Sequence, residues 1–399
     1  MTGVGVVAPG ATGVVEFWAA LLDPAAPARV RRVHDADADA ADFVRRHDAR
    51  RLDRFAAFAV HAAGQALDRS GLRATVDPDR VAVVIGTGMG GLVAHAEAVR
   101  MMIERGRVPP LTGPKTMPNA AASAVSMAYG LRGPTEALAT ACAAGTHSIG
   151  HAARLVATGL ADAAVAGAAD GCLTDADVAA FDVIGALSPS GVSRPFDTAR
   201  DGFCAAEGAG VVVLEPLDDA RRRSAPVLLE VLGAGSSADA HHITAPDPTA
   251  SGAIRCVRAA LADACLAPGA IRHVNAHGTA TPRNDASEAR ALRAVFGTVP
   301  PITSVKGVTG HPLGAAGAVE VVAVALTVAH RTLPPTAGTV DVEEPDLDVV
   351  LQARPWVPGA VLSTSFGFGG LNGALVLAPM DDLAPMDDLA PMDDSVAGP

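Results

Sequence analysis

Hydrophobic and polar positions follow two alternating patterns along most of this chain. Short runs of apolar, often β-branched residues are separated by longer Ala-rich segments in which apolar positions recur at helical spacing. Apolar runs of this kind are typical of strands that are buried on both faces of a sheet. The pattern therefore predicts an α/β protein whose sheets are covered by helices on both sides.

The predicted elements fall into two groups that would join near residues 215–226. Strands are expected at 80–85, 163–169 and 210–214 in the first group, and at 227–232, 273–276, 302–304 and 374–377 in the second. Helices are expected at 54–70, 147–158, 254–265, 285–296 and 315–329. The unit LAPMDD then repeats three times from residue 377 to residue 394. With a proline and two adjacent aspartates in each unit, this segment predicts a disordered acidic tail over 378–399.

Composition and charge narrow the function classes. The chain has 399 residues, 49% of them hydrophobic, which is enough for one large core or two fused ones. A net charge of −12 argues against general nucleic-acid binding. No secretory signal and no long, uninterrupted apolar stretch is present, which predicts a soluble cytoplasmic protein without a membrane span. The five cysteines show neither CxxC pairing nor histidine at metal spacing, so we expect no disulfide framework and no metal site.

One cysteine stands in a setting that suggests chemistry. In the segment ATACAAGTHSIG, Cys142 lies where an apolar strand gives way to a helix of small residues. A thiol exposed at such a turn is expected to have its pKa lowered by the positive end of the helix dipole. Two histidines follow in glycine-rich loops, His277 in NAHGTATP and His311 in KGVTGHPLGAAGAVE. Of 31 basic residues only Lys115 and Lys306 are lysines, and we interpret Lys306, five residues before His311, as required by the site.

A second motif suggests a different function, dinucleotide binding. Residues 86–91, GTGMGG, follow an apolar run and fit the dinucleotide-binding fingerprint. That fingerprint requires a second strand ending in an acidic residue about 20 positions later. The sequence there, AEAVRMMIERGRVPP, predicts a helix followed by a proline turn. We therefore expect no nucleotide site.

The segments ATAC, NAHGTATP, KGVTGHPLGAAGAVE and SFGFGG, in this order and at these distances, resemble the β-ketoacyl synthases of fatty-acid and polyketide assembly, members of the thiolase superfamily. The resemblance spans about residues 2–377 and implies duplicated βαβαβαββ halves that form a five-layered α-β-α-β-α core. The first half would be residues 1–220, with the nucleophile, and the second residues 221–377, with both histidines. Relatives carry several residues before the segment that matches residues 2–7, so we expect a shortened first strand.

The resemblance implies a decarboxylative Claisen condensation of malonyl-[acyl carrier protein] with an acyl chain held as a thioester. Cys142 would be the nucleophile that forms this covalent intermediate. His277 and His311 would bind the malonyl thioester carbonyl and support decarboxylation. Lys306 and Glu320 match a pair that would hold His311 in orientation.

Further positions match the oxyanion hole and the substrate pocket of the family. Phe368, in SFGFGG, matches a gating phenylalanine whose backbone N–H would join that of Cys142 in the oxyanion hole. The two threonines of NAHGTATP, Thr279 and Thr281, match residues that hydrogen-bond the pantetheine arm. Met89 and Phe181 match positions in the acyl pocket.

The partners implied by the resemblance are an acyl carrier protein and a second subunit. The basic segment RRHDARR, with Arg45, Arg46, Arg50 and Arg51, matches a surface that receives the acidic carrier protein. The second subunit would be an identical chain or a chain-length factor. No cofactor is implied, because the substrates arrive on the phosphopantetheine of the carrier.

The sequence leaves several alternatives open to comparison. Relatives usually have CTSG at the nucleophile and FGFGGTN near the end, whereas this chain has CAAG and FGFGGLN; these changes favour a type II polyketide pathway over primary fatty-acid elongation. Thiolases carry another cysteine in the stretch that here is SFGFGGLNG. Initiating synthases use Cys-His-Asn, which His311 contradicts. A non-catalytic chain-length-factor-like subunit would lack the nucleophile, whereas Cys142 is present.

Overall fold

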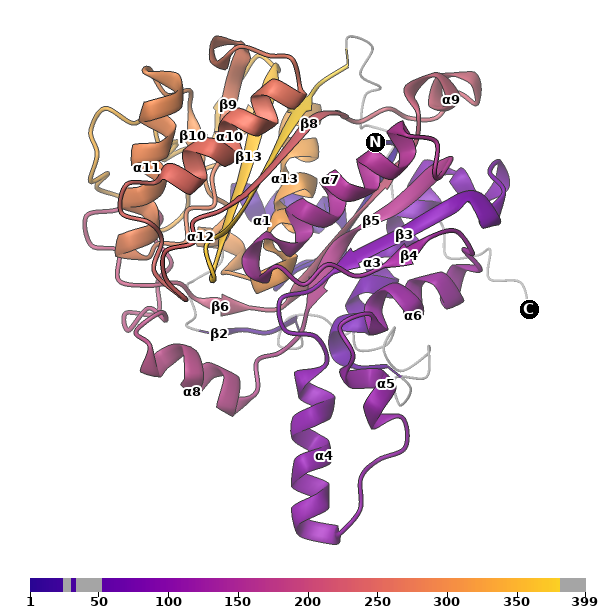
Figure 1. Ribbon diagram of the computed structural model, residues 1–399. Helices are drawn as coiled ribbons and strands as arrows, with labels where there is room; N and C mark the ends of the chain where they lie inside the picture. Colours follow the sequence, from indigo (N-terminus) through magenta and orange to yellow (C-terminus); the bar gives the residue numbers. More distant parts are fainter. Residues whose placement is uncertain (24–29, 34–51, 381–399) are drawn as a thin grey trace.

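Two five-stranded mixed sheets organise residues 1–23, 30–33 and 52–380, the part of the chain that the computed structural model describes (Figure 1). In the first sheet, β3 runs parallel to its two neighbours, whereas β7 is antiparallel to β1 and β5. The strand order is β1 (Gly3–Val7), β7 (Gly208–Leu214), β5 (Ala163–Asp170), β3 (Val81–Gly86) and β4 (Thr135–Glu136).

The second sheet uses strands from the C-terminal part of the chain. β9 is parallel to β10 and β13, and β14 is antiparallel to β13 and β8. The order is β10 (Ile302–Thr303), β9 (Ile271–Asn275), β13 (Ala360–Gly367), β14 (Leu371–Ala378) and β8 (Glu230–Ala238).

Helices form three layers around and between these sheets. α3 (Arg54–Ser70) and α6 (Ala120–Tyr129) cover the outer face of the first sheet. α7 (Ala144–Ala157) and α13 (Ala316–His330) lie between the sheets and contact strands of both. α10 (Ser251–Asp263) and α11 (Pro282–Phe296) cover the outer face of the second sheet. The α-β-α-β-α order confirms the predicted fold class.

The two helices of the middle layer pack closely against each other. A Cβ added at Gly145 would lie 2.5 Å from the backbone nitrogen of Ala318, so glycine allows α7 and α13 to approach closely. The segment Leu313–His330 is long and apolar enough to cross a membrane, but 89% of it is buried inside the protein. Its hydrophobicity is therefore explained by its position between the sheets.

Smaller elements surround this core. Within the described residues, the other α-helices are α1 (Val14–Leu22), α4 (Leu92–Arg105), α5 (Thr112–Thr116), α8 (Asp175–Val183), α9 (Leu217–Arg222) and α12 (Lys306–Thr309). The remaining strands are β2 (Val30–Arg31), β6 (Ala205–Ala206), β11 (Thr332–Leu333) and β12 (Arg354–Pro355). In Figure 1, α4 extends away from the body of the molecule and the chain returns through α5.

Most predicted elements are present, and the differences concern their bounds and the strands that were not predicted. The helix predicted at 54–70 has the bounds of α3, whereas α7, α10 and α11 each begin three residues earlier than expected. The strand predicted at 227–232 was placed too early, because β8 continues through the small residues GAGSSA, where pairing with β14 holds it. β13 was not predicted from the sequence. All five positions of β1, the first strand, pair with β7. The predicted tail, apart from residues 378–380, and the arginine segment at 45–51 lie outside the described residues.

Candidate active site

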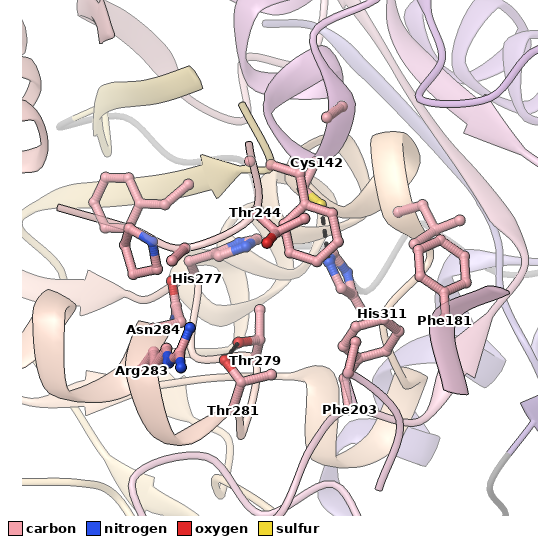
Figure 2. Close-up of a pocket in the computed structure, with 18 of the residues that line it drawn as sticks. Cys142, Phe181, Phe203, Thr244, His277, Thr279, Thr281, Arg283, Asn284 and His311 are labelled. Atoms are coloured by element: carbon pink, nitrogen blue, oxygen red, sulfur yellow. Dashed lines mark hydrogen bonds between the residues drawn. The ribbon is translucent and has the colours of Figure 1, made fainter. Parts of the chain in front are cut away.

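A cavity of about 380 Å³ is lined by the predicted catalytic cysteine, both histidines, Phe368 and the predicted substrate-binding residues, but not by Lys306 or Glu320, and has two chemically different sides (Figure 2). Thr279, Thr281, Arg283 and Asn284 lie on the side of His277 in Figure 2. The hydroxyl oxygens of Thr279 and Thr281 lie 2.9 Å apart and share a hydrogen bond. The other side is apolar and is lined by Met89, Phe181, Ile184, Ala186, Phe203, Leu313 and Phe368.

The nucleophile candidate lies in a tight turn at the start of α7. Residues Ala141–Ala143 form a short 3₁₀ turn, and Ala141 has a left-handed φ of 48°. The loop that carries Phe368 approaches this turn closely, since a Cβ added at Gly367 would lie 3.1 Å from the amide nitrogen of Cys142. This approach brings the backbone N–H groups of Cys142 and Phe368 to the same thiol, where both lower its pKa.

The thiol itself differs from the sequence prediction. Cys142 is only 8% exposed, and burial raises its pKa to about 11. The Lys306 ammonium and the two backbone N–H groups oppose this shift, and the Asp170 carboxylate adds to it. The expectation of an exposed thiol with a lowered pKa was therefore wrong, because loss of solvation outweighs the favourable dipoles.

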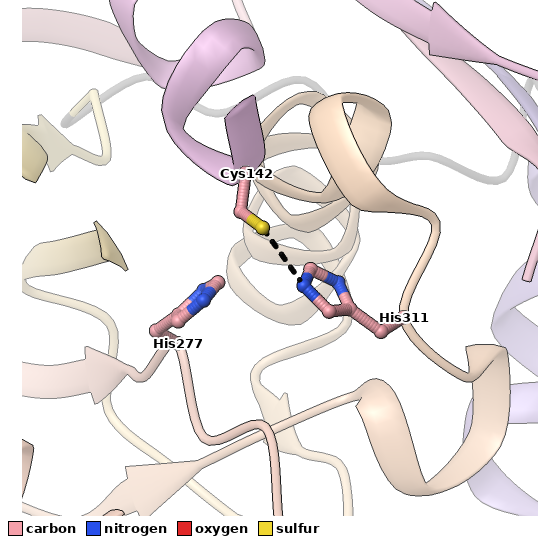
Figure 3. Close-up of side chains that lie close together, drawn as sticks. All are labelled: Cys142, His277 and His311. Atoms are coloured by element: carbon pink, nitrogen blue, oxygen red, sulfur yellow. Dashed lines mark hydrogen bonds between the residues drawn. The ribbon is translucent and has the colours of Figure 1, made fainter. Parts of the chain in front are cut away.

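Two histidines complete a compact cluster with Cys142 (Figure 3). Nε2 of His311 lies 3.2 Å from Sγ of Cys142, and the His277 and His311 rings are 5.3 Å apart at 82°. Both rings are buried, and burial together with the nearby Lys306 charge holds the pKa of each well below its usual value. At neutral pH the site therefore contains a neutral thiol and two neutral imidazoles.

Lys306 lies beneath this cluster and contacts a different histidine from the one expected. Its Nζ donates to the His277 carbonyl oxygen at 2.5 Å, approaches Nδ1 of the same residue at 3.3 Å, and forms an ion pair with Glu320. We expected this pair to orient His311, whose Nδ1 is buried without a hydrogen-bond partner in the part of the chain that the structure describes. An ammonium can only donate, so Nδ1 of His277 accepts and the neutral ring carries its proton on Nε2.

His311 is held through its backbone and by ring packing. Its backbone N–H donates to the Cys204 carbonyl at 2.7 Å, and its carbonyl accepts from the Ala206 N–H at 3.0 Å. The Phe203 ring packs edge-on against the imidazole, with centroids 5.1 Å apart. These contacts fix the ring direction without a hydrogen bond to Nδ1.

Glu288, on α11, anchors the loop that carries His277. It is fully buried and accepts from the backbone N–H groups of His277 and Gly278, each at 2.8 Å, and from the Thr364 hydroxyl at 2.7 Å. Burial raises the pKa of this carboxyl, while these donors and Lys306 lower it. Glu288 has no role in the sequence analysis, where its spacing from His277 was the available signal.

Asp170, at the end of β5, was missed entirely. Its buried carboxylate accepts from the Thr87 hydroxyl at 2.7 Å and from the backbone N–H groups of Gly88, Met89 and Gly314 at 2.8, 3.2 and 2.6 Å. It therefore ties the loop of Met89 to the turn that follows His311. Burial raises its pKa to about 6, and all four of these hydrogen bonds oppose that shift.

The same cluster has the composition of a metal site. The candidate ligand atoms of Cys142, His277 and His311 lie within 4.8 Å of one another. Zinc accepts cysteine and histidine donors, so these three residues are the set that would hold such an ion. The sequence predicts no metal here, and a nucleophilic thiol must be free to attack carbon.

Comparisons with known proteins place the chain among the ketosynthases. The model of the β-ketoacyl synthase N-terminal domain matches residues 23–220, and that of the C-terminal domain matches residues 228–339. A 3-oxoacyl-[acyl-carrier-protein] synthase 2 of Coxiella burnetii is 39% identical, covering 96% of this chain and 98% of the relative. The corresponding protein of Vibrio harveyi is also 39% identical, covering 94% and 97%.

Solved structures give the same result. The ishigamide ketosynthase/chain length factor superposes with a TM-score of 0.87 at 32% identity, covering 95% of this chain and 98% of the other. A type II polyketide ketosynthase in complex with its acyl-carrier protein and bound to the hexaketide has a TM-score of 0.86 at 28% identity, with the same coverage.

Proposed function

The chain belongs to the β-ketoacyl synthase family and is a 3-oxoacyl-[acyl-carrier-protein] synthase, an acyltransferase, and on this basis we propose the roles of its residues. One observation carries the proposal: the Cys142 thiol lies 3.2 Å from His311, beside His277, in a cavity with polar and apolar sides. Cys142 is the nucleophile, and the two histidines act on the thioester carbonyl.

In the first half-reaction the acyl chain moves from the carrier to Cys142. Sγ attacks the thioester carbonyl, and Nε2 of His311 accepts the thiol proton during attack, because both groups are neutral beforehand. The backbone N–H groups of Cys142 and Phe368 stabilise the oxyanion. The carrier thiolate leaves and takes the proton.

In the second half-reaction malonyl-carrier loses CO2, and the electron pair of the broken C–C bond forms an enolate. Nε2–H of His277, whose tautomer Lys306 fixes, donates to the enolate oxygen. The enolate carbon attacks the acyl carbonyl, Cys142 leaves as a thiolate and takes up a proton, and 3-oxoacyl-carrier is released. Each condensation thus consumes one proton and releases one CO2.

The pathway and the second subunit form the finer part of the proposal. We place the chain in a type II polyketide pathway, supported by the CAAG and FGFGGLN departures and by a type II polyketide ketosynthase among its structural neighbours. The curated relatives are 3-oxoacyl synthases 2, so fatty-acid elongation is the alternative.

The exposed two-residue strand β4 ends the first sheet and leaves its outer edge available to a second subunit, either an identical chain or a chain-length factor. Carrier docking on Arg45, Arg46, Arg50 and Arg51 and a cytoplasmic location stay predictions.

The test uses the purified chain, acyl-carrier and malonyl-carrier, read by intact-protein mass. We expect an acyl adduct on the protein, a 3-oxoacyl-carrier product, and neither with Cys142→Ala. An adduct without extension would indicate that a partner subunit is required. Equal acylation of Cys142→Ala would refute the assignment of the nucleophile.

A further inference from the structure

We propose that His147 is a positioning residue for the oxyanion hole, whose two donors it holds in place from outside the cavity. The inference rests on the proposed function and adds a residue to its machinery. His147 lies in the first turn of α7, five residues after the nucleophile, and neither His147 nor Thr140 is among the residues that line the cavity. The ring therefore acts on the reaction through its neighbours and does not touch the substrate.

The His147 ring joins two segments that are far apart in the sequence. Its Nδ1 lies 2.9 Å from the Thr140 hydroxyl oxygen, and its Nε2 lies 3.0 Å from the Asn372 carbonyl oxygen. A carbonyl can only accept, so Nε2 carries the proton and Nδ1 accepts from the Thr140 hydroxyl. Burial lowers the pKa of His147, which keeps the ring in this neutral form at neutral pH.

One end of this bridge supports the turn of the nucleophile. Thr140 stands two residues before Cys142, directly before Ala141 with its left-handed φ of 48°. Residues with a Cβ rarely adopt this conformation, so the turn depends on its surroundings to keep it. The hydrogen bond from Thr140 to His147 is one such support, and it lies next to the backbone N–H of the nucleophile.

The other end of the bridge is on the hairpin that carries Phe368. This residue lies in the turn between β13 and β14, and Asn372 is the second residue of β14, paired with Phe366 across the hairpin. Gly373 allows the ring to reach this strand, because a Cβ there would lie 3.1 Å from both Nε2 and Cδ2 of His147. The bridge therefore connects the segments that supply the two donors of the oxyanion hole.

The two segments meet backbone to backbone. A Cβ added at Gly367 would lie 3.1 Å from the Cys142 nitrogen and 3.2 Å from the Thr140 carbonyl oxygen. A small shift between the segments would therefore move the N–H groups of Cys142 and Phe368 apart. An oxyanion hole works through donors that already point to the position of the developing charge, so such a shift slows the reaction without removing a donor.

Two reactions of the same thiol separate this role from a merely structural one. Acyl transfer to Cys142 develops negative charge on a carbonyl oxygen and needs the oxyanion hole. Alkylation by iodoacetamide is a displacement at a saturated carbon and develops no oxyanion. General damage to the turn would slow both reactions alike. The ratio of the two rates therefore reports on the oxyanion hole.

The experiment measures acylation of the purified chain by hexanoyl-carrier and alkylation by iodoacetamide, both by intact-protein mass. Thr140→Val removes one hydrogen bond of the bridge and His147→Leu removes both, with little change in volume. We expect each variant to lower the maximal acylation rate about tenfold, less than the ~10²–10³-fold cost of losing an oxyanion donor outright. The loss is smaller because the hydroxyls of Thr146 and Ser365, 2.7 Å apart, still tie α7 to β13.

Two quantities should stay within about threefold of the wild type, the concentration of hexanoyl-carrier at half-maximal rate and the rate of alkylation. His151→Leu makes the same substitution one turn later on α7, where the ring contacts Glu136 at 2.7 Å outside the cavity lining, and should leave both reactions unchanged. The double variant Thr140→Val/His147→Leu should be no slower in acylation than His147→Leu, because both changes break the same bridge.

Unchanged acylation in both single variants, an equal fall in alkylation, a double variant in which the two losses multiply, or the same defect in His151→Leu would overturn the inference. Each of these outcomes leaves the proposed function intact, because the wild type is still acylated. A wild-type chain that hexanoyl-carrier does not acylate would instead refute the proposed function.

Discussion

The buried Lys306–Glu320 pair gives the sharpest test of how this site is built. The side chain of Lys306 is 0% exposed and that of Glu320 is 2% exposed, and burial raises the pKa of Glu320 to about 7 despite the ammonium beside it. Lys306→Met would leave a buried carboxylate without its cation, with one oxygen that has no hydrogen-bond partner among the described residues even now. We expect the free energy of unfolding to fall by about 3–5 kcal/mol.

The double variant Lys306→Met/Glu320→Leu removes both charges and should regain most of that stability, because well-packed apolar groups often replace a buried ion pair at little cost. The double variant should not regain CO2 release when it regains stability. Both variants lose the contact between the ammonium and Nδ1 of His277, which fixes the tautomer that donates to the enolate. Loss of such a supporting contact typically costs about 10–100-fold, and we expect this in CO2 release from malonyl-carrier.

The assay combines urea unfolding of each variant with CO2 release under saturating malonyl-carrier. Lys115→Met is the matched control, since it makes the same substitution at the other lysine of the chain, on α5 and outside the cavity. Recovery of CO2 release together with stability in the double variant would show that Lys306 serves folding alone. A Lys306→Met protein as stable as the wild type would refute the assignment of a buried ion pair.

Three further predictions follow from the site and its packing. The rate of Cys142 alkylation by iodoacetamide should rise about tenfold per pH unit from pH 7 to pH 10, because the thiol pKa is about 11; a plateau near neutral pH would contradict this. His277→Ala should leave acyl loading within about threefold and lower CO2 release at least tenfold, whereas His311→Ala should lower both, since its Nε2 contacts the thiol; equal loading by the two variants, measured by intact mass, would count against this division. Gly145→Ala should lower the free energy of unfolding by about 1–3 kcal/mol, because its Cβ would meet the backbone of Ala318; an unchanged urea midpoint would show that α7 and α13 can separate freely.

The sequence predicted the architecture well because the pattern that identifies each strand or helix lies within that element itself. The apolar runs of β3, β5 and β7 are buried at every position, so they read as continuous hydrophobic segments. β13 escaped prediction because its segment AVLSTSFG carries three hydroxyl side chains in its interior. Their burial against neighbouring strands depends on contacts far away in the sequence, such as the bond from Asn275 to Ser363.

Motif order and spacing brought Cys142, His277 and His311 together correctly, but they did not supply the contacts beneath them. The family resemblance led us to expect Lys306 at His311, and only the fold shows its ammonium against His277. Asp170 gave no signal because its four donors come from residues 81–83 positions earlier and 144 positions later. The contacts that support the catalytic residues from behind therefore depend on the whole fold and not on a motif.

The error over the thiol pKa has a functional consequence. A helix dipole is visible in the sequence, whereas the amount of solvent removed from Cys142 depends on the loop at Gly367, on α13 and on the histidines. Because burial keeps the thiol neutral, little thiolate is available to oxidants or stray electrophiles in the resting enzyme. Reactivity must then arise when a thioester carbonyl enters the cavity, where attack and proton transfer to His311 proceed together and the backbone N–H groups of Cys142 and Phe368 stabilise the developing charge. The dry environment that raises the pKa also strengthens these interactions in the transition state, so the same burial that suppresses side reactions favours the intended one.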